Sequence, residues 1–234
     1  MNPVRIVAER EVRQFLHNRQ MVIVSAVMAF VFAGLSGPAI VLTPDSDPAH
    51  LADQLGLYLV PMIGILMAYL IAGQVFLREK TEKTIETFLC APVTLRQIWS
   101  GKVLGVTLPA YGITLTAAMV MYGLASVSGN SLVYPSLPVM AHILLVVPCI
   151  ITAVTGLLGF SQLLLGLREN QVIGFLVFFG VVFAMTFTRQ ALNPAFAVTW
   201  SALGLILGGV LVLISCTWYL TRFLSRERIV TTLP

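Results

Sequence analysis

The strongest constraint on this chain is a series of long stretches that contain no Asp, Glu, Lys or Arg. A helix needs about 20 mainly apolar residues to cross the hydrocarbon core of a bilayer. The uncharged stretches cover residues 21–42, 55–77, two halves of 103–167, 171–188 and 195–221. We therefore predict an all-α polytopic membrane protein with six transmembrane helices.

The composition supports the same class. Of the 234 residues, 58% are hydrophobic and 10% are charged, whereas a water-soluble domain has about a quarter of its residues charged. This balance excludes a soluble enzyme, a nucleic-acid-binding module and a disordered chain. We expect no nucleic-acid partner despite the net charge of +4.

Turn-forming residues mark the connections between the predicted spans. Gly129, Asn130 and Pro135 lie in the middle of the long uncharged interval and predict a loop at 128–138. Asn193-Pro194 follows the shortest span. Two readings of residues 180–199 stay open, a span boundary or a segment that dips into the outer leaflet and returns.

The distribution of Lys and Arg predicts the orientation. If alternate connecting segments lie on opposite sides, 13 of the 14 basic residues fall on the side of the termini and only Arg189 falls on the other. Cytoplasmic segments of membrane proteins carry this basic excess. We therefore expect both termini, including the tail 222–234, in the cytoplasm, and the protein in the cytoplasmic (inner) membrane.

Residues 1–20 have the pattern of an amphipathic helix. Asn2-Pro3 is a suitable start for a helix. Apolar and charged residues then follow helical spacing on separate faces, with Val4, Ala8, Val12, Phe15 and Leu16 on one and Arg5, Glu9 and Arg13 on the other. This pattern is typical of a helix in the membrane interface. The alternatives are a cytoplasmic extension of the first span and, more weakly, a signal peptide cleaved near 33–37, for which the n-region is too long.

The loop 78–102 carries eight charged residues and is the most informative stretch of the chain. Glu79 with Lys83, and Glu82 with Glu86, are four residues apart. This spacing predicts that the second span continues into the cytoplasm as a charged helix until Pro92 interrupts it.

A second, short helix is predicted after this proline, with Thr94 as its cap. Its apolar and polar residues separate by helical spacing, with Leu95, Ile98, Trp99 and Lys102 on one face and Arg96, Gln97 and Ser100 on another. We expect this helix to be exposed and to need a docking surface. Lipid headgroups and a protein partner both remain open as that surface.

The spans lack the residues on which common membrane chemistry depends. No Asp, Glu, Lys or Arg lies deep in a predicted span, which argues against ion-driven transport. His142 falls near the outer end of the fourth span, where we expect an interfacial residue without a functional role. Val103 follows Gly101-Lys102 where a P-loop requires Ser or Thr, so we expect no ATP hydrolysis by this chain itself and no enzymatic activity. We also predict no metal site and no catalytic residues.

Pairs of small residues recur four positions apart in the predicted spans. They include Gly101 with Gly105 and Gly204 with Gly208. Small residues at this spacing let transmembrane helices approach closely. We interpret these pairs first as helix packing and second as a subunit interface.

The run from Arg78 to Leu89, then Ala91-Pro92-Val93, Ile98 and Gly101-Lys102, resembles the type 2 ABC exporter permeases. The layout is similar as well, with an amphipathic N-terminal helix at 1–20, a six-span permease domain at 21–234 and a larger loop between spans two and three. About 25 residues carry motif-like specificity. The first outer loop is short, as in the compact members of that family.

The resemblance implies a permease subunit that pairs with a second permease, identical or different, and with two cytoplasmic ATPase subunits. ATP and Mg would be bound by those ATPases, and no cofactor by this chain. The loop would be the main ATPase contact and the next cytoplasmic loop a smaller one. The ATPase-coupling residues predicted in this way, or by the amphipathic pattern, are Glu79, Glu82, Glu86, Pro92, Leu95, Arg96, Ile98, Trp99, Lys102, Arg168 and Glu169.

The resemblance implies outward transport, and the uncharged predicted pathway favours a hydrophobic or amphipathic substrate. An alternative from another class is a membrane anchor or assembly scaffold that recruits a cytoplasmic partner without transport. An ion-driven carrier or channel ranks last, because it requires a polar site within the membrane.

Overall fold

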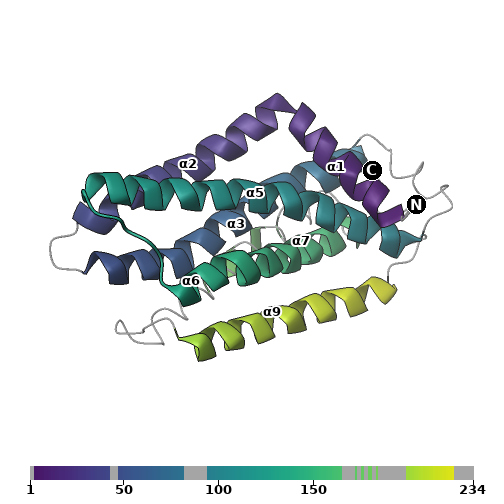
Figure 1. Ribbon diagram of the computed structural model, residues 1–234. Coiled ribbons are helices and arrows are strands. Elements are labelled where there is room, and N and C mark those ends of the chain that lie inside the picture. Colours follow the sequence, from purple (N-terminus) through teal and green to yellow (C-terminus); the bar gives the residue numbers. More distant parts are fainter. Residues whose placement is uncertain are drawn as a thin grey trace.

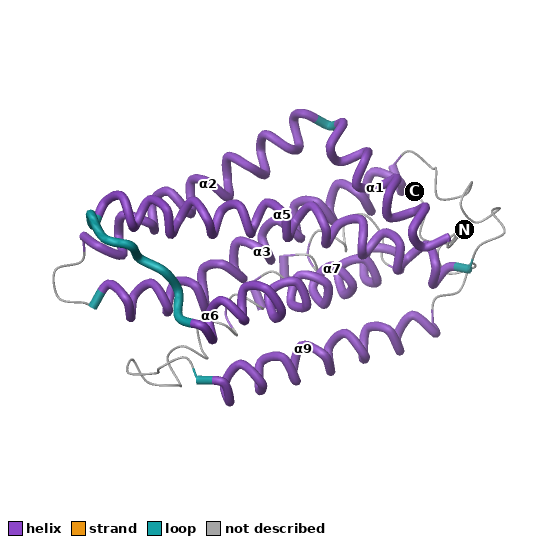
Figure 2. Tube along the Cα trace, viewed as in Figure 1, coloured by secondary structure: helices purple, strands orange, loops and turns teal. Residues whose placement is uncertain are grey.

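The computed structural model describes residues 3–42, 47–81, 94–164 and 199–223, together with six positions between 172 and 183. The described part is all-helical (Figures 1 and 2). Its helices are α1 (Pro3–His17), α2 (Arg19–Leu42), α3 (Pro48–Thr81), α5 (Leu95–Ser128), α6 (Leu137–Ala141), α7 (Val147–Leu164) and α9 (Trp200–Leu220). A π-helical turn, η1 (His142–Val146), joins α6 to α7, and a 3₁₀ turn, η2 (Thr221–Phe223), follows α9.

Five helical segments in the described part are long and apolar enough to cross a membrane. They are Arg19–Leu42, Pro48–Phe76, Leu95–Ser128, Leu137–Gln162 and Trp200–Leu220. The prediction of an all-helical membrane protein is confirmed at this level. The predicted span 171–188 lies mostly outside the described residues.

The local sequence explains where two of the spans begin. The Asp47 side chain accepts a hydrogen bond from Ala49 N (3.2 Å) and Pro48 occupies the first position of α3. Thr94 and Gln97 form a reciprocal capping box at the start of α5. This confirms the prediction that Thr94 caps the helix.

The first turns of α5 differ from the expectation in one respect. The residues from Leu95 to Lys102 do not form a separate short helix, because α5 continues without a break to Ser128. At 1.5 Å per residue this helix is about 51 Å long, which exceeds the hydrocarbon thickness of about 30 Å. Part of it must therefore extend beyond the membrane core.

α3, α5, α7 and α9 run roughly along one axis and give the bundle two ends, while α2 is inclined to them (Figure 1). We call the end where α1 and α5 begin and α3, α7 and α9 finish the basal end, and the opposite end the distal end. α3, α5 and α7 pack against one another and supply most of the buried core, while α2 and α9 flank them. α1 meets α2 in a bend at Asn18 and lies across the basal part of α5 (Figure 2).

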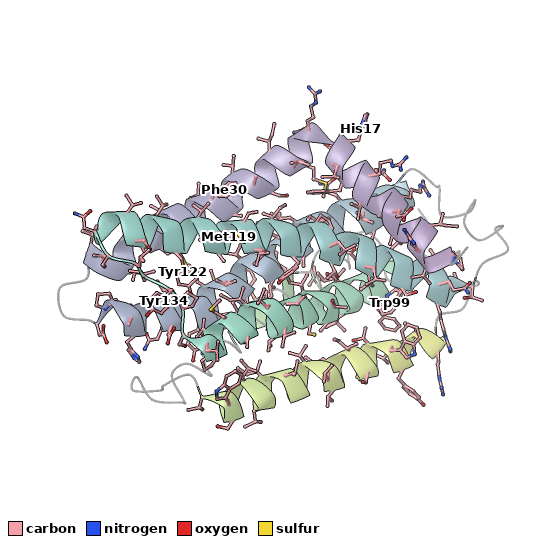
Figure 3. The ribbon with its side chains drawn as sticks, viewed as in Figure 1. His17, Phe30, Trp99, Met119, Tyr122 and Tyr134 are labelled. Carbon is pink, nitrogen blue, oxygen red and sulfur yellow. The ribbon has the colours of Figure 1, made fainter. Side chains whose placement is uncertain are left out.

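The predicted loop at 128–138 is confirmed, since α5 ends at Ser128 and α6 begins at Leu137. Side chains hold this distal loop against the bundle. Asp53 Oδ1 accepts a hydrogen bond from Ser136 N (2.7 Å). In the same part of the bundle, the Tyr122 hydroxyl of α5 donates to the Ala52 carbonyl oxygen of α3 (3.1 Å), and Figure 3 shows Tyr122 and Tyr134 at the distal end.

Large apolar side chains cover the outer faces of the flanking helices. Those on α2 and α9 include Val27, Phe30, Leu35, Leu205 and Val212, all exposed, and Figure 3 shows Phe30 directed away from the bundle. An apolar surface of this extent is not tolerated in water. It indicates contact with lipid or with another apolar protein surface.

Candidate functional site

The basal end brings together α1, α3, α5, α7 and α9 around the start of α5. Contact between α1 and α5 depends on two glycines one helical turn apart. A Cβ at Gly101 would lie 2.6 Å from Val7 Cβ and 2.9 Å from the Val4 carbonyl oxygen, and one at Gly105 would lie 2.6 Å from Glu11 Cβ. These distances are too short for any side chain. Gly101 and Gly105 therefore allow α1 to pack directly on the backbone of α5.

A buried ion pair crosses this helix contact. Lys102 Nζ lies 3.4 Å from Glu11 Oε1, and the two side chains are only 2% and 3% exposed. The ammonium also lies 5.5 Å from the centroid of the Phe76 ring, within range of a cation–π contact. Lys102 thus joins α5 to both α1 and α3.

The ring of Phe76 is held by a third helix. A Cβ at Gly159 would lie 2.6 Å from Phe76 Cζ, so the ring packs directly on the backbone of α7. Glu11, Lys102 and Phe76 form what we call the basal joint. Burial of two charges is expensive unless they remain paired, so the joint fixes the position of α1 along α5.

Trp99 packs on the other side of α5, between that helix and α9 (Figure 3). Its ring centroid lies 6.1 Å from that of Trp218, with an angle of 57° between the rings. Gly156 of α7 leaves room for the indole, because a Cβ there would lie 3.2 Å from Trp99 Cζ2. Trp99 Nε1 is buried and makes no hydrogen bond with the described residues.

The expectation of an exposed apolar docking face on the first turns of α5 is wrong. Ile98 is 8% exposed and Trp99 is 5% exposed. The amphipathic pattern is real, but helices of the same chain cover its apolar side. Arg96 is exposed and Leu95 is half-buried, so of the predicted coupling residues between Leu95 and Lys102 these two remain accessible.

The structure does not describe the side chains of the other predicted coupling residues. Glu82, Glu86 and Pro92, and Arg168 with Glu169, fall outside the described residues. Glu79 is within the last turns of α3, but its side chain is not among those described.

Unlike Gly101 and Gly105, the predicted pair Gly204 and Gly208 does not lie at a contact between described helices. A Cβ at Gly204 or Gly208 would meet no described atom within 4 Å, and both residues are on the exposed side of α9. This pair does not support packing within the described part of the chain.

Glu11 is a functional candidate that sequence reasoning missed. It shares the buried face of α1 with Ala8 and Phe15, so an acidic residue interrupts an apolar face. This interruption is the signal in the sequence that could have identified Glu11 as a buried residue with a partner. Its partner is 91 residues away in the sequence, and no local pattern identifies it.

His142 is also placed differently from the expectation. It is 1% exposed rather than interfacial, and it begins the π-helical turn η1. Neither ring nitrogen makes a hydrogen bond within the described part of the chain. Among the described residues, no group of three His, Cys, Asp or Glu side chains is arranged to hold a metal ion.

No known protein-family model matches the chain, and no curated protein matches its sequence.

Proposed function

We propose that this protein is the permease subunit of an ATP-driven ABC exporter of the type 2 class. It would cross the inner membrane six times with both termini in the cytoplasm, so that the basal end faces the cytoplasm. A separate ATPase would supply the energy, because the sequence has no P-loop of its own. The cargo would be hydrophobic or amphipathic.

The observation that carries the proposal is the connection of the start of α5 to the rest of the bundle. α5 begins directly after the charged loop that resembles an ATPase contact. Within its first eight residues, Trp99 contacts α9 and Lys102 contacts α1 and α3. A push on the start of α5 would therefore move several helices together, as a transporter driven from the cytoplasm requires.

The direction of the helices supports a sixth crossing. α7 ends at the basal end, whereas α9 begins at the distal end (Figure 1). The chain must return from one end to the other between Leu164 and Thr199. The candidate interval 171–188 is uncharged, and its described positions are helical.

The proposed mechanism assigns different roles to the exposed and buried residues of this region. Arg96 and Leu95, at the basal tip of α5, would contact the ATPase. Ile98, Trp99 and Lys102 would act as positioning residues that pass its movement to the bundle. ATP-driven closure of two ATPases would then reorient two paired permeases and open a path outward.

Site-specific photo-crosslinking tests the ATPase contact. We expect p-benzoylphenylalanine in place of Arg96 to crosslink the chain, in its native membrane, to a protein with a P-loop. The same group in place of Leu132, which is 87% exposed on the distal loop, is the matched control and should give no such product. Equal labelling from both positions, or a product at 96 that has no nucleotide-binding motif, would favour the scaffold alternative.

A further inference from the structure

A groove runs along the line where α1 crosses the outer face of α5. Its volume is about 640 Å³, which is within the range of about 300–1,000 Å³ found for small-molecule sites. Its lining comes from both helices and consists of Val4, Arg5, Ala8, Glu9, Val12, Arg13, Leu16, Leu104 and Leu108.

The α1 side of the groove carries the charge. Arg5 Nε donates to Glu9 Oε1 (2.8 Å) on the exposed surface. A guanidinium has five N–H donors, and this contact uses the one on Nε. Arg13 is exposed and makes no hydrogen bond or ion pair with the described residues. Two arginines against one glutamate favour an anionic ligand, and their planar groups suit the oxygen atoms of a phosphate.

The α5 side of the groove is apolar and continues onto a membrane-spanning face. Leu104 is 43% exposed and Leu108 is 59% exposed. Both belong to the candidate span Leu95–Ser128, and they lie one turn apart on the same face of α5. A ligand here would meet cationic groups on the α1 side and apolar side chains on the α5 side.

We propose that this groove binds one anionic phospholipid of the surrounding bilayer. Its anionic headgroup would lie against Arg5 and Arg13, and the upper part of an acyl chain would lie along Leu104 and Leu108. A lipid held in this way would stabilise α1 against α5 beside the basal joint. The proposal requires the chain to be in a membrane and does not depend on an ATPase partner.

Native mass spectrometry of the detergent-solubilised chain tests the site, with phosphatidylglycerol and phosphatidylcholine as probes. A neutral detergent micelle presents no charged surface that would retain phosphatidylglycerol. The phosphatidylglycerol that is counted is therefore bound by the protein. We expect the wild-type chain to retain one phosphatidylglycerol in preference to phosphatidylcholine by about tenfold. Arg5→Gln combined with Arg13→Gln should abolish this preference.

The matched control is Arg10→Gln combined with Arg19→Gln, which removes the same charge from exposed positions that do not line the groove. This variant should keep the preference. An equal loss in both double variants, or no preference in the wild type, would overturn the proposal.

A phosphatidylglycerol with a photoreactive group on its acyl chain gives a second measurement that does not depend on any variant. We expect its crosslinks to concentrate on the α5 peptide that contains Leu104 and Leu108. Crosslinks spread evenly over the exposed faces of α2, α5 and α9 would show general solvation by lipid and would also overturn the proposal.

Discussion

Glu11→Gln is expected to lower the free energy of unfolding by about 3–5 kcal/mol, the usual cost of removing one partner from a buried ion pair. Lys102 would stay at a position where its side chain is only 2% exposed, without the carboxylate that compensates for its burial. The stability of the purified chain in a graded detergent denaturation measures this effect. The matched control is Glu9→Gln, on the same helix but in an exposed pair with Arg5, for which the loss should be below about 0.5 kcal/mol.

Changing both partners separates an ion pair from a general requirement for polar groups. Glu11→Gln combined with Lys102→Met should be close to the wild type in stability, because replacing a buried pair by uncharged groups is often neutral. Losses that simply add in the double variant would contradict the coupling that the 3.4 Å contact implies.

Gly105→Ala is expected to destabilise the chain by about 1–3 kcal/mol, the usual cost of overpacking. The new methyl group would be 2.6 Å from Glu11 Cβ, so α1 must move away from α5. Gly101→Ala should act in the same direction, because its methyl group would approach both Val7 Cβ and the Val4 carbonyl oxygen. Faster hydrogen exchange of α1 in these variants would locate the damage.

Gly208→Ala is the matched control for this substitution. A Cβ there meets nothing within 4 Å among the described residues, and alanine favours helix by up to about 1 kcal/mol over glycine. We expect no loss of stability. If Gly105→Ala and Gly208→Ala behaved alike, the close contact between α1 and α5 would not be a feature of the folded protein.

The sequence predicts features that arise from neighbours along the chain. Uncharged runs locate the spans because crossing a bilayer requires a minimum apolar length. Thr94 identifies the start of α5 and Gly129 the start of the distal loop, because caps and turns are decided by a few adjacent residues.

Features that depend on distant contacts were not predictable. The sequence places Lys102 on one face of a short exposed helix, and only the structure shows that Glu11 and Phe76 lie beside it. The apolar face with Ile98 and Trp99 is evident in the sequence, but periodicity does not say whether the covering surface is lipid, a partner or the same chain. The position of His142 in the predicted span indicates an interfacial residue, whereas its observed burial depends on how the helices pack.

The central claim is that a separate ATPase drives this membrane protein through its basal end. Mass spectrometry of the complex, purified gently from its native membrane, tests the claim most directly. We expect a P-loop ATPase in equal amount with this chain, and ATP hydrolysis by the complex that slows in Glu11→Gln. Recovery of the intact chain without any ATPase, under conditions that preserve known transporter complexes, would contradict the proposed function.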